Sequence, residues 1–280
     1  MKIREMILPR GWYPDNAHAI ADFLKRHPQK AASEDKGIVS AFAPHAGWFY
    51  SGICAAKAIS ALDADCQTIA VIGGHLSAMP LLMAEEEAVS TPLGIMEIDA
   101  ELRDEFALAL KRDKIEYAGD SYSDNTVEVL LPMVKHYFPH AKLLWLRFSA
   151  LLSSYDAGIL LASCAKKLNR KLALIASSDL THYGVNYNFS PMGRGKVALD
   201  WVMNVNDKKI LDAVLSDDAA LVLKCAQEDY SSCSAGALLG AMAFSRGKKA
   251  RLLDYRTSAA AMEGREVPDS FVGYASMIWE

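Results

Sequence analysis

Three histidines of this chain each follow an apolar run that is typical of a buried strand. The runs cover residues 38–43, 68–72 and 172–176, and the histidines that follow them are His45, His75 and His182. In an open α/β sheet the carboxyl ends of neighbouring strands meet at one crevice, where ligands bind. Three imidazoles at such a crevice predict a metal site or a proton-transfer site.

His182 lies in the densest polar cluster of the chain, residues 177–184. Asp179 precedes it by three residues, a spacing that brings two side chains together on one turn of a helix. A carboxylate beside an imidazole fixes the tautomer of the ring and raises its basicity. We therefore predict that Asp179 and His182 form a catalytic pair. The alternative is that Ser178 and Asp179 only cap a short helix.

Two more histidines and one cysteine stand where a ligand could be held. His45 follows a proline that ends its strand, and the alternative for it is a capping histidine at the edge of the core. His75 follows the glycine pair 73–74, which would let the backbone approach a bound group. Cys233 directly precedes a predicted helix at 234–245, and a helix N-terminus favours the thiolate that binds metals. On its own, such a cysteine is more often inert packing.

The composition is that of an ordinary globular enzyme. A net charge of −4 gives no reason to expect nucleic acid or an anionic membrane as a partner. No apolar stretch approaches the roughly 20 residues that span a bilayer, and the first residues lack the apolar core of a signal peptide. The five cysteines form no Cys-x-x-Cys pair and are odd in number, which favours a reducing cytoplasm.

The elements that must position these residues alternate between strand-like and helix-like patterns. Strands are predicted at 38–43, 68–72, 143–148, 172–176, 251–256 and 271–278, with a further strand pair around 81–89 and 95–98. Helices are predicted at 52–62, 100–111, 126–137, 153–168, 194–203, 207–215, 218–227 and 234–245. This alternation indicates a sheet with helices on both faces. Because no linker or low-complexity tract interrupts the chain, we predict one domain over 1–280, an αβα sandwich with a mixed, mostly parallel central sheet.

Several short motifs, taken in order, make the chain resemble the Memo family, also called component B of the AmmeMemoRadiSam system. They lie at residues 11–14, 44–52, 73–75, 91–94, 127–132, 177–184 and 233–236, so the resemblance covers nearly the whole chain. It implies an α/β fold similar to that of the class III extradiol dioxygenases, which use non-haem iron(II).

The resemblance also implies a set of site residues and partners. The metal ligands would be His45, His75, His182 and Cys233, with Asp179 adjacent, and the metal iron or copper. Microbial members of the family are associated with radical-SAM and AMMECR-type proteins, and an animal relative is linked to phosphotyrosine peptides. One departure is Asn125, which stands where the family usually has a histidine and so removes one proton-transfer group from the pocket wall.

Imidazoles and a thiolate suit iron(II), copper or zinc and are poor ligands for magnesium or calcium. The first hypothesis is a metal-dependent redox or oxygenase-like protein, although an oxidisable sulfur ligand disfavours efficient ring cleavage. In it, His45, His75 and Cys233 are ligands, and His182 is a ligand or an acid/base group.

Two other hypotheses stay open. A non-catalytic module could hold a peptide, an anion or another small molecule, or a partner side chain in the same crevice, and it ranks second. A zinc hydrolase with Asp179 or His182 as general base ranks third.

Overall fold

The computed structural model describes residues 1–27, 37–76, 79–262 and 266–280. Its strands are β1 (Ile3–Arg4), β2 (Ser40–Ala43), β3 (Thr68–Leu76), β4 (Leu81–Met83), β5 (Ala88–Val89), β6 (Met96–Glu97), β7 (Tyr117–Gly119), β8 (Lys142–Ser149), β9 (Leu172–Ser177), β10 (His182–Gly184), β11 (Ala250–Thr257) and β12 (Ser270–Trp279). Its α-helices are α1 (Ala17–Arg26), α2 (Trp48–Ile59), α3 (Ala100–Arg112), α4 (Asn125–Glu128), α5 (Leu131–Tyr137), α6 (Ser153–Lys167), α7 (Lys196–Trp201), α8 (Asp207–Leu215), α9 (Ala219–Glu228) and α10 (Ala235–Phe244).

A large mixed sheet runs through the described part of the chain, in the order β10-β12-β2-β9-β3-β8-β4-β7, with β11 also paired to β12. The four central strands β2, β9, β3 and β8 are parallel. The strands that flank them, β12 and β4, pair antiparallel with β2 and β8. The predicted mixed α/β sheet is therefore confirmed, with continuous parallel pairing confined to its centre.

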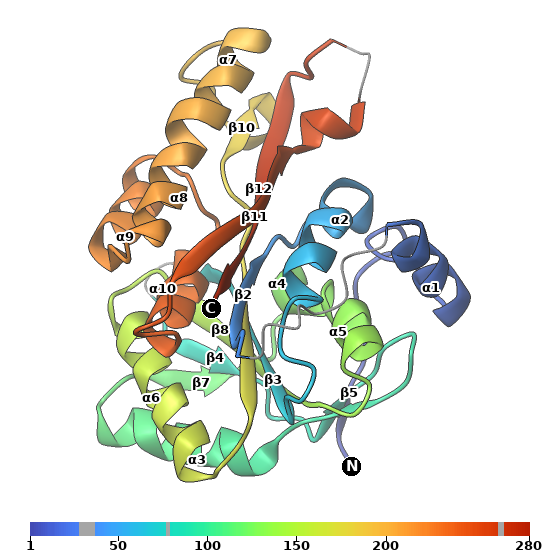
Figure 1. Ribbon diagram of the computed structural model, residues 1–280, viewed down its shortest axis with the longest axis vertical. Coiled ribbons are helices and arrows are strands. Elements are labelled where there is room, and N and C mark those ends of the chain that lie inside the picture. The colour runs from blue at the N-terminus through green and yellow to red at the C-terminus, as the bar shows by residue number, and fades with distance from the viewer. Residues whose placement is uncertain (28–36, 77–78, 263–265) are drawn as a thin grey trace.

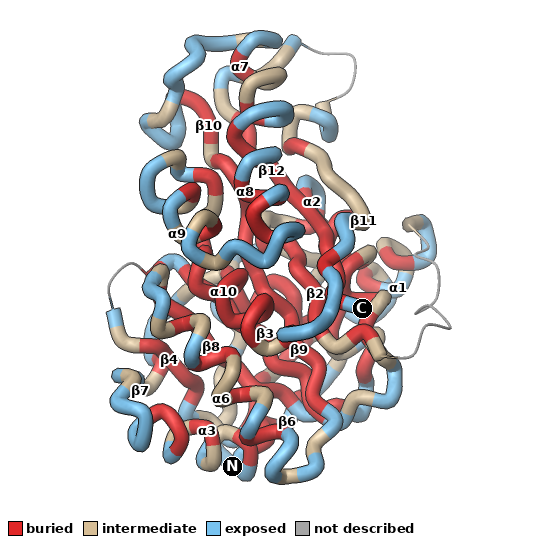
Figure 2. Tube along the Cα trace, turned by 60° about the vertical axis from the view of Figure 1, so that its left-hand side comes forward, coloured by how far each residue is buried: buried red, intermediate tan, exposed pale blue. Residues whose placement is uncertain are grey.

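Helices cover both faces of the sheet, as Figure 1 shows with α3, α6 and α10 on one side and α1, α2 and α5 on the other. The central strands are mainly apolar, because successive side chains point to opposite faces and both faces are buried. Phe42 thus packs in one hydrophobic cluster, and its neighbours Ala41 and Ala43 pack in the other. In Figure 2 these strands form the buried centre of the molecule.

The structure differs from the predicted elements in a few places. The predicted strand pair around 81–89 and 95–98 is divided, because β4 joins the large sheet whereas β5 pairs with β6 and β1 in a small one. The single helix predicted at 126–137 is two helices, and the second of them has Pro132 in its first turn, where the missing N–H costs nothing. Residues 178–181 form no helix, and His182 begins strand β10.

No helix in the described ranges is both long enough and apolar enough to cross a membrane.

Candidate metal centre

The carboxyl ends of three parallel strands bring the predicted residues together. Strand β9 lies between β2 and β3 and is parallel to both. His45 follows the end of β2 by two residues, His75 lies near the end of β3, and Asp179 comes two residues after β9. The convergence that the sequence predicts for these strand ends is therefore present in the fold.

His45, His75 and Cys233 form a cluster in which one ligand atom from each residue lies within 4.8 Å of the others. The Cys233 Sγ is 3.2 Å from Nε2 of His45. The rings of His45 and His75 meet edge to face, with their centroids 5.0 Å apart. His45 is buried, Cys233 is half-buried and His75 is exposed. Three of the four predicted ligands are thus close enough to share one metal ion.

The surroundings of His45 decide which ring nitrogen faces the cluster. The Ser177 hydroxyl donates to the carbonyl oxygen of Thr126, so its oxygen is free to accept from His45. It lies 3.0 Å from Nδ1 of His45, which therefore carries the proton. The Nε2 atom, which faces Cys233, is left with its lone pair, the state that binds a metal.

His75 is oriented by a carboxylate in the same way. Its Nδ1 lies 3.0 Å from Oδ2 of Asp124, a residue that the sequence reading did not select. Partial burial lowers the pKa of His75, but hydrogen bonds with Asp124 and Cys233 outweigh burial and raise it to about 9. For Asp124, burial raises the pKa, and the hydrogen bonds from His75 and Thr126 outweigh this and lower it to about 2. Asp124 is therefore an ionised acceptor that fixes the His75 tautomer.

Cys233 is held by backbone groups of Asp179. The Asp179 N–H donates to Sγ of Cys233 at 3.3 Å, and the Asp179 carbonyl oxygen accepts from the Cys233 N–H at 3.3 Å. Helix α10 begins two residues later, with Ser234 as its N-cap. These backbone contacts and the start of the helix fix the position of the sulfur beside the two imidazoles.

His182 lies outside this cluster of three, and the helical turn that was predicted to join it to Asp179 is wrong. Its Nδ1 donates to the carbonyl oxygen of Leu180 at 3.1 Å. Asp179 instead accepts, through Oδ1, from the backbone N–H of His45 at 2.7 Å. Desolvation lowers the pKa of His182, and the charge of Asp179 only partly opposes it. The fourth-ligand and catalytic roles of His182, and the catalytic role of Asp179, stay predictions.

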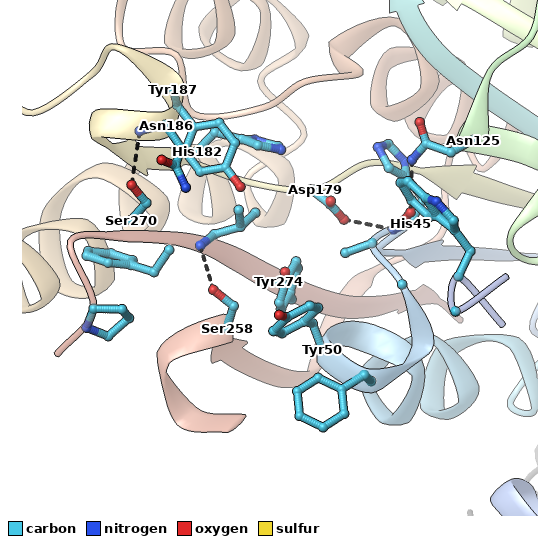
Figure 3. A pocket seen from close by; sticks show the side chains of 18 of the residues that line it. His45, Tyr50, Asn125, Asp179, His182, Asn186, Tyr187, Ser258, Ser270 and Tyr274 are labelled. Carbon is cyan, nitrogen blue, oxygen red and sulfur yellow. Dashed lines mark hydrogen bonds between the residues drawn. The ribbon is translucent and has the colours of Figure 1, made fainter. Parts of the chain in front are cut away.

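A cavity of about 730 Å³ opens over the cluster, a size suited to a small-molecule ligand. In Figure 3, His182 and Tyr187 lie on one side and His45 and Asn125 on the other, with Asp179 between them. Aromatic side chains that line the cavity include Trp12, Phe49, Tyr50, Tyr187 and Tyr274. Asn125 donates to the carbonyl oxygen of His45 at 3.1 Å, so at this position the chain has a positioning amide.

The glycine pair before His75 makes room for the protein itself. A Cβ on Gly73 would lie 2.0 Å from the hydroxyl of Thr126, and one on Gly74 would lie 2.3 Å from the Cβ of Ser234. The prediction that these glycines admit a bound group is therefore corrected. Gly73 lets β3 pack directly against α4, and Gly74 lets it pack against the loop that contains Cys233.

Gly74→Ala is expected to destabilise the protein by about 1–3 kcal/mol, since the added methyl must displace the backbone of Ser234. Urea unfolding measures this change. Gly47→Ala is the matched control, because Gly47 has a φ of −53° and its Cβ would meet nothing nearer than 3.5 Å. Equal stability of the two variants would contradict the tight packing of Gly74 against the loop of Ser234.

Two residues of the site, Asp124 and Arg147, were not predicted from the sequence. Arg147 lies in β8, its side chain is 5% exposed, and it donates to Asp124 at 3.2 Å. The sequence did contain an indication for Arg147, because an arginine inside an otherwise apolar strand requires buried acceptors.

Comparisons with known proteins find similarity over nearly the whole chain. A family model described as Memo-like protein matches residues 4–278. A MEMO1 family protein of Methanococcus vannielii is 28% identical over 99% of this chain and 100% of that protein. One of Archaeoglobus fulgidus is 26% identical over 96% of each chain. Among solved structures, the uncharacterized protein JW3007 of Escherichia coli K12 shares the fold, with a TM-score of 0.54 and 14% identity over 86% of this chain and 99% of that one.

Proposed function

The chain belongs to the Memo-like protein family, and we propose that it is a metal-dependent redox or oxygenase-like protein. In this proposal, His45, His75 and Cys233 hold iron(II) or copper at the carboxyl ends of the central strands. The oxygenase-like part of the proposal comes from the resemblance to the class III extradiol dioxygenases.

The main support for this proposal is that the ring nitrogens and the sulfur of the cluster are already oriented as metal ligands. Two imidazoles have their Nδ1 protons engaged by Ser177 and Asp124, and a sulfur lies within reach of both rings. Such outer acceptors fix the tautomer and orientation of a metal-binding histidine and raise its basicity. The mixture of nitrogen and sulfur donors suits iron(II) or copper, and a metal of this kind supplies one-electron redox chemistry when bound.

The residues around the cluster supply the rest of the site. His182 is neutral at pH 7, because desolvation lowers its pKa, and its Nδ1 is engaged by Leu180. Its Nε2 can therefore accept a proton from a molecule in the cavity over the cluster. The aromatic walls of that cavity exclude water from one face of such a molecule.

The test is the metal content of protein purified without oxygen. We expect about one iron or copper per chain, and Cys233→Ala and His45→Ala to lose at least about 100-fold in affinity, since outer-acceptor changes alone cost 10–100-fold. Cys66→Ala is the matched control, because Cys66 precedes β3 and so lies at the opposite end of that strand from His75.

Three outcomes would decide against this proposal. Stoichiometric zinc with no iron or copper would favour the zinc hydrolase. No metal after reconstitution would favour the second candidate, a peptide- or ligand-binding module, for which the large aromatic-lined cavity is the supporting observation. Equal metal loss in Cys66→Ala would show that the losses do not come from the cluster.

Radical-SAM and AMMECR-type proteins are proposed partners on the resemblance alone. Co-purification from the source cell, compared between the wild type and His45→Ala, tests whether they bind and whether the crevice takes part.

A further inference from the structure

A second cavity, of about 460 Å³, lies next to the one already described. Its walls include Phe189, Ala226 and Tyr230, and Cys233 lines it as well. Tyr230 is 62% exposed, so it stands at the rim rather than in the interior. Phe189 and Tyr230 contact each other, with ring centroids 5.3 Å apart.

The two cavities reach different members of the cluster. His45 and His75 line the larger cavity, whereas Cys233 lines the second one. His182 and Tyr187 line both, and their rings meet at 83° with centroids 4.9 Å apart. These two rings are therefore the partition between the cavities.

Both residues of the partition, His182 and Tyr187, are positioned by the backbone around them. His182 is fixed by the Leu180 carbonyl and by the pairing of β10 with β12. Tyr187 ends the short 3₁₀ helix 185–187, which follows β10 directly. A molecule in the larger cavity would consequently leave the second one open.

The lining of the second cavity indicates what it can admit. None of the described residues that line it is an aspartate, glutamate, lysine or arginine. Bringing an unpaired charge into such surroundings costs several kcal/mol, whereas a small apolar molecule can contact the aromatic walls.

We propose that the second cavity is a separate entrance through which small, uncharged, sulfur-reactive molecules reach Cys233. The histidine side of the cluster is served by the larger cavity. The use of this entrance during turnover rests on the proposed function, whereas access to the sulfur does not.

The test uses metal-free protein and methyl methanethiosulfonate, a small uncharged thiol reagent. The Cys233 thiolate attacks its sulfenyl sulfur, the mixed disulfide forms, and methanesulfinate leaves with the electron pair of the broken S–S bond. The rate is followed by mass spectrometry after cleavage at Glu228 or Asp229, which separates Cys233 from Cys225 and from the other cysteines.

Ala226→Phe narrows the second cavity and is expected to slow this reaction at least about tenfold, since thiol exchange depends on access to the sulfur. Asn186→Trp narrows the larger cavity and is the matched control, expected to leave the rate within about twofold. An Ala226→Phe rate equal to wild type, or an equal slowing by Asn186→Trp, would overturn the proposal.

Two further measurements keep the test decisive if Ala226→Phe does not fold. Tyr230→Asn removes a rim ring, keeps a residue that tolerates the left-handed φ of 51° there, and is expected to speed the reaction. An anionic methanethiosulfonate is expected to react more slowly than the neutral one, relative to their rates with a small free thiol. No change in either measurement would count against the entrance. Because no metal is used, failure here and failure of metal binding are distinguishable.

Discussion

Arg147→Met is expected to destabilise the protein by about 3–5 kcal/mol, because it removes the guanidinium that two buried carboxylates share. Arg147 approaches Asp120 at 3.5 Å and Asp124 at 3.2 Å, and the side chains of these two acids are 0% and 8% exposed. It also donates twice to the carbonyl oxygen of Gly74, from Nε at 3.1 Å and from a terminal nitrogen at 3.0 Å. One guanidinium thus neutralises two acids and holds the segment that ends in His75.

The consequence of this substitution extends to the cluster. His75 has a left-handed φ of 57°, a conformation that costs a non-glycine residue of order 1–3 kcal/mol and persists only when its surroundings impose it. It also lies at an irregularity of the β3–β8 pairing, which re-aims the side chain. Loss of Arg147 removes the contact to Gly74 and weakens the hold on Asp124, so we expect metal affinity to fall together with stability.

Urea unfolding of wild type, Arg147→Met and Arg147→Lys measures the effect. Lysine restores the charge but cannot reproduce the planar set of donors, so an intermediate loss is expected. Arg194→Met is the matched control, because the Arg194–Asp269 pair is 65% and 56% exposed and such pairs contribute less than about 1 kcal/mol. A similar small loss at both positions would contradict the role given to Arg147.

Asp207 is expected to make the folded state lose stability as the pH rises from about 4 to 7. It is completely buried at the first position of α8. It accepts from the Thr181 N–H at 3.0 Å and from the Tyr255 hydroxyl at 2.8 Å. Burial raises its pKa to about 7, although hydrogen bonds from Thr181 and Tyr255 act in the opposite direction.

The sign follows from where the proton resides. Between the ordinary pKa of 3.8 and the folded value near 7, the native state keeps a proton that the unfolded chain has released. The free energy of unfolding therefore decreases as the pH rises across this window. Above the window, Asp207 adds no further pH dependence. At about 1.4 kcal/mol for each pKa unit, the total change is about 4 kcal/mol.

Asp207→Asn keeps the shape of the side chain and removes the titration. The difference in free energy of unfolding between wild type and Asp207→Asn, measured in urea from pH 4 to 8, isolates this group from all other acids. As the pH rises across the window, we expect the wild type to lose about 4 kcal/mol of stability relative to the variant. A difference that does not change with pH would show that Asp207 is ionised at both ends of it.

Sequence patterns alone predict the layered fold and the histidines that follow its central strands. The runs at 38–43, 68–72 and 172–176 are apolar apart from Ser40 and Thr68, because the strands they form are covered on both faces, and that pattern is local. Parallel strands in such a fold end at one edge of the sheet, so His45 and His75 could be placed together before any contact was known. The motif at 233–236 added Cys233 through the resemblance.

How these residues are held, and which of them meet, depends on contacts between distant parts of the chain. Asp124 lies 49 positions after His75, Arg147 lies 73 positions after Gly74, and no periodic pattern joins either pair. Strand β10 exists because three residues beginning at His182 pair with a strand that starts at Ser270, so the helical turn predicted for Asp179 and His182 gave way to a long-range pairing. The local spacing of apolar residues indicates which face of a helix or strand is buried. The partners of a buried charge, and the pairing of a short polar strand, depend on which distant groups the folded chain leaves without a hydrogen bond.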